Sequence, residues 1–378
     1  MSSITIKVVQ SKAELKKFVR FANNLYKGNN YYVPAIVFDE LSTFDKKKNG
    51  AFEFCEAELY LAYKDGKAVG RVAAIINHKA NERWKVKQVR FGWIDFIDDI
   101  EVSSALLDAV SAFGKAHGME QIVGPLGFTD FDPEGMLVEG FDRLSTMALI
   151  YNHPYYPEHL KKLGFGKETG WLEYRITIPE KVSERYYNLA EVVKERYNLK
   201  ILKLSRREIL KQGYGHKFFE LINQTYCNLY GFSLLTPKQI DSYVGLYLSL
   251  IDTRMITFVE NDKGELIGAA AAIPSLSVAL QKCRGEIFPF GWWHLLKAMF
   301  IKRSKTLELL LIGVRPDYQN CGVNSLIILD LAERFREMGF QFAETNAMLE
   351  NNDKIHAMWK PFEKEQHKAR WVFGKELL

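Results

Sequence analysis

Residues 307–325, with the sequence LELLLIGVRPDYQNCGVNS, contain a strand, a glycine-bearing turn and the start of a helix. Residues 307–314 are apolar except for Glu308, which is typical of a buried strand. Pro316 ends that strand, because proline cannot donate to a sheet ladder. Beyond the turn, apolar residues recur at helical spacing as far as Met338. The turn therefore aims backbone N–H groups and the positive end of a helix dipole at one spot, which suits a phosphate or pyrophosphate.

The spacing of Val314, Pro316, Gln319 and Gly322 resembles the acyl-CoA loop of the GNAT superfamily of N-acyltransferases. The pattern of that family is Gln/Arg-x-x-Gly-x-Gly/Ala. This sequence departs from it at Asn324, where a small residue is usual and where a side chain would crowd the pyrophosphate. Any strand, turn and helix with a glycine would share part of the pattern, since short glycine motifs match often.

The resemblance implies that acetyl-CoA or another acyl-CoA is the co-substrate and that this loop holds its pyrophosphate. Residues 352–359 resemble the family's Asn-x6-Tyr segment, which packs near the thiol end of CoA, with Trp359 in the place of the tyrosine. The cofactor-binding residues that the resemblance implies are Ile312, Gly313, Val314, Gln319, Asn320, Cys321, Gly322, Val323, Asn324, Ser325 and Asn352.

The composition is that of an ordinary globular protein. Of the 378 residues, 47% are hydrophobic and 26% are charged, and this length allows two domains. The formal net charge of +5 is spread along the chain, and its densest run, at residues 46–48, is typical of a solvated loop. We expect no nucleic-acid binding, because no basic stripe or binding motif accompanies this charge.

The cysteines and the N-terminus indicate a cytoplasmic protein. The four cysteines are scattered, with no metal-ligand spacing and no disulfide framework, which predicts free thiols and no metal site. The first residues do not form a signal peptide, and no apolar run is long enough to span a bilayer. Residues 288–301 are rich in aromatic side chains, and we interpret them as a buried helix, with contact to a membrane or an acyl chain as the alternative.

The two halves of the chain resemble each other element by element. Each opens with a strand and a capping box, formed by Ser11 and Glu14 in one half and by Ser205 and Glu208 in the other. Each continues with a hairpin that has a glycine at its far end. Such self-similarity indicates a duplicated domain, although two unrelated halves with common hairpin chemistry would also fit.

With this duplication, the resemblance to GNAT proteins extends over nearly the whole chain. It implies the class α/β (α+β), with two tandem GNAT-like domains, each a mixed, mostly antiparallel sheet flanked by helices. We assign residues 1–180 to a degenerate, acceptor-side domain and residues 181–378 to the domain with the acyl-CoA loop. The first half has Asp98, Asp99 and Glu101 where the loop would be, and these carboxylates would repel a pyrophosphate.

Acyl transfer from CoA to an amine needs a base, because an ammonium must lose a proton before it attacks. Glu308 is the candidate base, although it would also suit the exposed start of the strand; Glu344 and Asn346 are second choices. By resemblance, the backbone N–H that stabilises the oxyanion comes from residues 312–314.

The proton donor to the thiolate is less obvious, because Trp359 has no acidic O–H. Tyr318, tyrosines of the other half, or water are the alternatives. Asn352 would orient pantetheine or water, or would cap a helix. His356 would suit an acid, a base or a surface position. Cys321 lacks a nearby base and is interpreted as a small residue in the turn.

An unusual loop in the first half, residues 124–135, combines glycines with carboxylates. It would line an acceptor pocket that favours a cationic amine, or it would be a long ordered surface loop. Residues 151–156 would face the same groove.

Three functions therefore stay open. The first is a cytoplasmic N-acyltransferase with a small-molecule or peptide amine as acceptor. The second is a catalytically weak acyl-CoA-binding sensor or carrier of the same fold, favoured by Trp359 and Asn324. The third is an aminoacyl-tRNA-dependent transferase, disfavoured by the lack of a basic stripe. The oligomeric state stays open as well.

Overall fold

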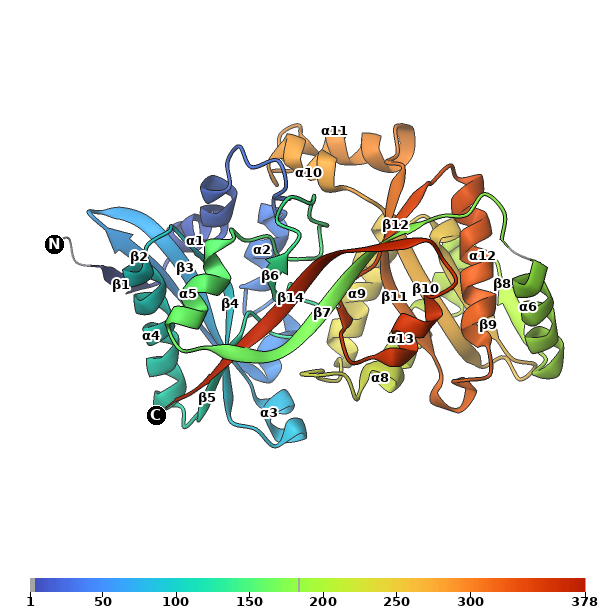
Figure 1. Cartoon of the computed structure of the whole chain (residues 1–378), viewed down its shortest axis with the longest axis horizontal. Coiled ribbons are helices and arrows are strands. Elements are labelled where there is room, and N and C mark those ends of the chain that lie inside the picture. Colours follow the sequence, from blue (N-terminus) through green and yellow to red (C-terminus); the bar gives the residue numbers. More distant parts are fainter. Residues whose placement is uncertain (1–3, 183, 378) are drawn as a thin grey trace.

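A single sheet of 14 strands runs through both halves of the protein, in the order β1-β2-β3-β4-β5-β14-β7-β12-β11-β10-β9-β8, with β6 beside β14 and β13 beside β7. The computed structural model describes residues 4–182 and 184–377. Figure 1 shows two lobes of strands and helices joined through the middle of this sheet. This is the class that the sequence predicts: two tandem GNAT-like domains with largely antiparallel strand pairing.

The two halves repeat one order of elements, and their bounds follow. The first half contains β1 (Thr5–Val8), α1 (Lys12–Leu25), α2 (Val37–Thr43), the 3₁₀ turn η1 (Gly50–Glu53), β2 (Cys55–Lys64), β3 (Lys67–Asn77), α3 (His78–Trp84), β4 (Gln88–Phe96), α4 (Ile100–Ala116), β5 (Gln121–Gly124), β6 (Met136–Glu139), α5 (Tyr155–Lys162) and β7 (Gly166–Thr177). The second half contains α6 (Glu184–Arg196), β8 (Lys200–Leu202), α7 (Arg206–Lys211), α8 (Tyr214–Tyr226), α9 (Pro237–Leu250), η2 (Thr253–Met255), β9 (Ile256–Glu260), β10 (Leu266–Pro274), α10 (Ser277–Cys283), α11 (Gly291–Leu296), the π-helical turn η3 (Lys297–Ile301), β11 (Thr306–Val314), η4 (Pro316–Tyr318), α12 (Val323–Glu337), β12 (Phe342–Glu344), β13 (Met348–Leu349), α13 (Asp353–Met358) and β14 (Lys364–Glu376).

Local signals in the sequence account for several element boundaries. Ser11 with Glu14 and Ser205 with Glu208 form the two predicted capping boxes, at the starts of α1 and α7. In the first half, Asp99 caps α4 and pairs with Lys64 at 2.7 Å. A carboxylate therefore occupies the helix start that corresponds to the glycine turn before α12.

The last strand of each half pairs with a strand of the other half. β14 lies antiparallel to β5, and β7 lies antiparallel to β12. β7 and β14 also pair with each other, side by side across the middle of the molecule (Figure 1). The predicted division between residues 180 and 181 falls in the segment that follows β7. This exchange of strands makes one continuous sheet out of two repeats.

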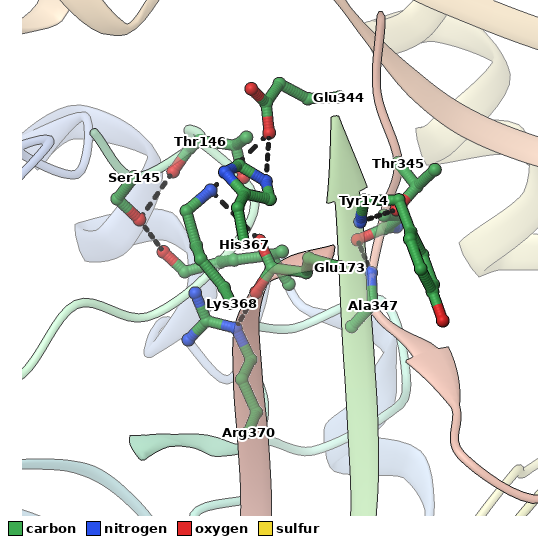
Figure 2. A network of polar contacts seen from close by, with 12 residues as sticks. Ser145, Thr146, Glu173, Tyr174, Glu344, Thr345, Ala347, His367, Lys368 and Arg370 are labelled. Carbon is green, nitrogen blue, oxygen red and sulfur yellow. Dashed lines mark hydrogen bonds and ion pairs between the residues drawn. The ribbon is translucent and has the colours of Figure 1, made fainter. Parts of the chain in front are cut away.

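A buried cluster of charges holds β7 and β14 together. Glu173 of β7 is fully buried and forms ion pairs with Arg370 and Lys368 of β14, the latter at 3.2 Å (Figure 2). Burial would raise the pKa of the Glu173 carboxyl, but the two cations hold this pKa below its ordinary value. Arg370 also donates to the backbone oxygens of Gly135 and Ile150, so the cluster anchors the loops around β6 as well.

The expectation of a buried helix at residues 288–301 is wrong. The segment forms α11 and η3, all described, and no residue of α11 is buried. Leu295, Ala298 and Met299 pack on a small cluster with Ile273 and Leu280, while the opposite side is open. A helix that is apolar all round does not specify by its sequence which side is covered.

Within residues 4–182 and 184–377, no helix has the length and apolar character required to cross a membrane.

The charge cluster leads to a prediction about stability. We expect Glu173→Ala to lower the free energy of unfolding by about 3–5 kcal/mol at neutral pH, because it leaves two buried cations unpaired. Since the folded-state pKa of Glu173 is lowered, its contribution is present at neutral pH and is lost as the pH falls through that pKa. Urea unfolding of the variant and of the wild type at two pH values measures both effects.

The matched control is Glu365→Ala on the same strand β14. The Glu365 side chain is 51% exposed and pairs with Arg143 at 2.7 Å. An exposed pair of this kind contributes roughly 0–1 kcal/mol. Equal losses in the two variants would show that the Glu173 cluster does not hold the exchanged strands.

Candidate functional site

A cavity of about 1360 Å³ lies between the two halves. On one side it is lined by β11, by the loop that follows β11 and by the start of α12. On the other side it is lined by Phe131 and its neighbours and by Trp171 of β7. The predicted CoA loop of the second half and the acidic loop of the first half thus face one space.

The loop between β11 and α12 has the predicted strand–turn–helix form. Gly322 precedes α12 with a φ of 83°, and a Cβ placed there would lie 2.7 Å from a methyl group of Val193. Glycine is therefore required both by the backbone and by packing against α6. The first turn of α12 begins directly after it, with N–H groups that have no partner within the helix. Asn324 in that turn is exposed and lines the cavity.

A cation from another helix lies beside this loop. Lys354 of α13 lines the cavity and donates to Oε1 of Gln319 at 3.3 Å, while Nε2 of Gln319 donates to the carbonyl of Val314 at 3.3 Å. Arg315 is the nearest arginine in the sequence, but it pairs with Asp317 and Glu265 instead. The sequence analysis did not single out Lys354, because nothing in the local pattern of α13 shows that it reaches the loop.

The strands β11 and β12 separate along the cavity. Their parallel pairing covers only Thr306–Glu308 with Phe342–Glu344. Beyond that point two side chains take the place of the missing strand. The Asn346 amide donates to the carbonyl of Leu310 at 3.4 Å. The Tyr226 hydroxyl accepts from the Ile312 N–H at 3.3 Å and donates to the Ile312 carbonyl at 3.1 Å.

This separation leaves the backbone of Ile312, a predicted oxyanion donor, on the cavity side of β11. Tyr226 lines the cavity from α8, and burial raises the pKa of its phenol, so that it keeps its proton at neutral pH. Sequence reasoning missed Tyr226. It belongs to no motif and comes from an element far from the loop in the sequence.

Glu308, the candidate base, is buried at the point where β11 and β12 part. Ser277 donates to its Oε1 at 3.3 Å, and among the described residues Oε2 has no hydrogen-bond partner. Burial raises the pKa of Glu308 to about 7. Glu308 is not among the residues that line the cavity, but the next residue, Leu309, is. Glu344, a second choice, forms an ion pair with His367 at 2.7 Å (Figure 2).

Most of the other predicted site residues line the same cavity. Trp359 is 8% exposed, and its Nε1 has no hydrogen-bond partner within the described part of the chain. Asn352 caps α13 by accepting from the Ile355 N–H at 3.3 Å, which is the structural role that the sequence left open. The predicted residues on the cavity wall are Ile312, Gly313, Val314, Gln319, Asn320, Gly322, Val323, Asn324, Asn346, Asn352 and Trp359, whereas Cys321 and Ser325 are not on it.

The acidic loop of the first half contributes three carboxyl groups to the cavity wall. Burial raises the pKa of Asp130 to about 6 and that of Asp132 to about 7. Burial and the charge of Asp130 raise the pKa of Glu134 well above its ordinary value. Three close carboxylates repel one another when all of them are ionised, and a cation bound among them would reduce this repulsion.

Comparisons with known proteins agree with this architecture. Residues 217–362 match the model of the acetyltransferase (GNAT) family. Protein YghO of Escherichia coli (strain K12) is 26% identical over 385 residues, covering 98% of this chain and 95% of that protein. The bacterial ceramide synthase of Caulobacter vibrioides is 23% identical and covers 100% of this chain and 98% of that protein.

A solved structure shows the same arrangement of two domains. It is a tandem GNAT protein from the clavulanic acid biosynthesis pathway, with a TM-score of 0.56 and 10% identity, covering 100% of this chain and 99% of that one. At 10% identity, the likeness between the two proteins shows a shared fold. Residues 217–362 thus match the GNAT family in sequence, and the whole chain shares the fold of a tandem GNAT protein.

Proposed function

We propose that this protein is an acyl-CoA-dependent N-acyltransferase that moves a long acyl chain from CoA to a long-chain primary amine. The observation that carries the proposal is the cavity between the halves, which combines the CoA loop, a mostly apolar wall and a group of carboxylates. GNAT folds in general support acyl transfer from CoA to an amine. The proposal adds to this general activity the length of the acyl chain and the kind of amine that accepts it.

The cavity supports a long-chain substrate by its size and lining. A volume of about 1360 Å³ exceeds the range of roughly 300–1,000 Å³ that is usual for small-molecule sites. Leu309, Leu311, Trp171, Ile176 and Phe362 contribute to its wall. An acyl chain or an alkyl amine would bury its surface against these side chains.

The name of one relative supports the same acceptor class. The Caulobacter protein that matches the whole chain is named a bacterial ceramide synthase. A ceramide is an N-acylated long-chain amino alcohol. Asp130, Asp132 and Glu134 would attract the ammonium group of such an acceptor, while the apolar wall would hold its chain.

The residues at the separated strands supply the chemistry of the transfer. Glu308, which does not itself line the cavity, takes the proton that the amine releases through water, and a base with a pKa near 7 is well matched to neutral pH. The amine nitrogen then forms a bond to the thioester carbonyl carbon and loses its surplus proton to water. The carbon–sulfur bond breaks, and the thiolate takes a proton from water to leave as CoA. The Ile312 N–H donates to the Tyr226 hydroxyl in the ligand-free protein, and it would stabilise the oxyanion between these steps once the acyl group displaces that hydroxyl.

The helix end next to Asn324 gives a test of the donor site. We expect Asn324→Asp to weaken CoA binding by about tenfold, because it adds a negative charge beside the pyrophosphate. The change keeps the size of the side chain, and a carboxylate near a helix N-terminus favours folding. Titration calorimetry with CoA measures the effect.

Asn24→Asp is the control for this test, since it adds the same charge at an exposed position of α1. Equal CoA affinity of the two variants would show that the pyrophosphate does not lie at the start of α12.

A direct assay tests the proposed reaction. Purified protein is given acetyl-CoA or palmitoyl-CoA with either ethylamine or sphinganine, and thiol release and amide formation are followed. We expect amide with palmitoyl-CoA and sphinganine, and much less with the short partners, because only the long chains fill the apolar wall. Binding of both acyl-CoAs without amide from any pair would contradict the proposal and favour a sensor or carrier.

The role of Glu308 gives a pH prediction. For the wild type, kcat/KM should rise with pH and level off above about pH 7, since the base must be unprotonated. Glu308→Gln should lower kcat by about 10²–10⁴-fold and remove this inflection, with little change in KM. Asp132→Asn, at a carboxyl with a similar pKa, should mainly raise KM for the amine. If Asp132→Asn lowered kcat and Glu308→Gln mainly raised KM for the amine, Asp132 would be the base.

A further inference from the structure

The outer side of α11 and η3 is a large exposed apolar surface. Phe288 and Phe290 are 75% and 77% exposed, and Trp292, Trp293, Phe300 and Ile301 are also exposed. We call these six residues the α11 surface. Figure 1 shows α11 along the rim of the molecule, away from the central strands. So many exposed large apolar side chains in one short segment are uncommon on soluble proteins and mark a site of interaction.

The α11 surface is held in a fixed position by contacts to the first half. Arg20 pairs with Glu286 at 2.7 Å, just before α11. The Val37 N–H donates to the carbonyl of Gly285 at 3.0 Å, and the Gln281 amide donates to the backbone oxygens of Asn30 and Tyr32 at 2.9 Å. These contacts hold α10 and the turn after it against the first half. The segment that carries the exposed aromatic side chains therefore starts from a fixed position.

The charged side chains within the segment that carries the α11 surface are all basic. No acidic residue occurs between Glu286 and Glu308 in the sequence. Lys297, Lys302 and Lys305 in this interval are exposed. The surface therefore combines an aromatic and aliphatic centre with a cationic border, which is the composition that favours the headgroup region of an anionic bilayer.

We propose that the α11 surface docks this protein on the surface of a membrane that contains anionic phospholipids. The aromatic side chains would enter the boundary between headgroups and acyl chains, and the lysines would lie over the headgroup phosphates. A second copy of the chain would have to bring two like-charged borders together, which disfavours that occupant.

Membrane docking would also bring apolar substrates close to the cavity. Leu310 belongs to the cluster on which the inner side of α11 packs, and the same residue lines the cavity. The docking proposal rests on the α11 surface and not on the proposed reaction, so each can fail without the other.

Flotation with lipid vesicles tests the proposal on the full-length protein. We expect binding to vesicles of phosphatidylcholine mixed with phosphatidylglycerol, weak binding to phosphatidylcholine alone, and weaker binding as salt is added. Bound protein should show a blue shift in tryptophan fluorescence, because Trp292 and Trp293 leave water.

Paired variants separate the apolar and the electrostatic contributions. Phe288→Ser with Phe290→Ser should reduce the partition coefficient by about tenfold or more, since two exposed phenyl groups no longer enter the lipid. Lys297→Glu with Lys302→Glu should remove the preference for phosphatidylglycerol. The control, Val192→Ser with Leu210→Ser, changes two side chains that are 58% and 57% exposed on α6 and α7, and should bind like the wild type.

Three results would overturn the proposal. The first is a wild type that floats with neither vesicle. The second is a serine variant at residues 288 and 290 that binds as well as the control. The third is a wild-type dimer that this variant converts to a monomer without any vesicle binding. CoA binding measured on the same variants should equal that of the wild type, which shows that they are folded and keeps this test apart from that of the reaction.

Discussion

The buried ion pairs of Glu173 with Arg370 and Lys368 are the constraint on which the rest of the structure depends. They lie where β7 and β14 cross between the two repeats, and full burial makes each charge costly without its partner. Because each buried charge needs its partner on the other strand, these ion pairs fix the register of β7 against β14. Arg370 extends this constraint to the loops at Gly135 and Ile150, and so to the acidic side of the cavity.

The separation of β11 from β12 has a second physical consequence. A strand edge that faces a cavity leaves backbone groups without partners, and such groups are costly when they are buried. Asn346 and Tyr226 satisfy those of Leu310 and Ile312 from two different elements. The same side chains therefore keep the strands apart and hold a backbone N–H at the edge of the space where an acyl group would lie.

The two repeats have diverged at corresponding places. The second copy starts α12 after Gly322, which leaves a helix end open to an anion, while the first copy starts α4 with the carboxylate of Asp99. The hairpin strands β3 and β4 are joined through the short helix α3, whereas β10 and β11 are joined through α10, α11 and η3. One copy thus presents carboxylates to the cavity, and the other presents a CoA loop and an exposed aromatic surface.

The capping boxes and the strand–turn–helix around Gly322 could be predicted from the sequence, because they follow from short-range periodicity and from backbone preferences of glycine and proline. The fold class was implied by the resemblance to GNAT proteins, and the duplication by the likeness of the two halves. The sequence also pointed to Glu308 and to the carboxylates of residues 124–135. Three features became visible only in the folded chain: β14 crosses into the first half, Tyr226 and Lys354 reach the site, and the outer side of residues 288–301 is exposed. These depend on contacts between segments far apart in the chain, and a local pattern of apolar and polar residues does not specify which partner covers which face.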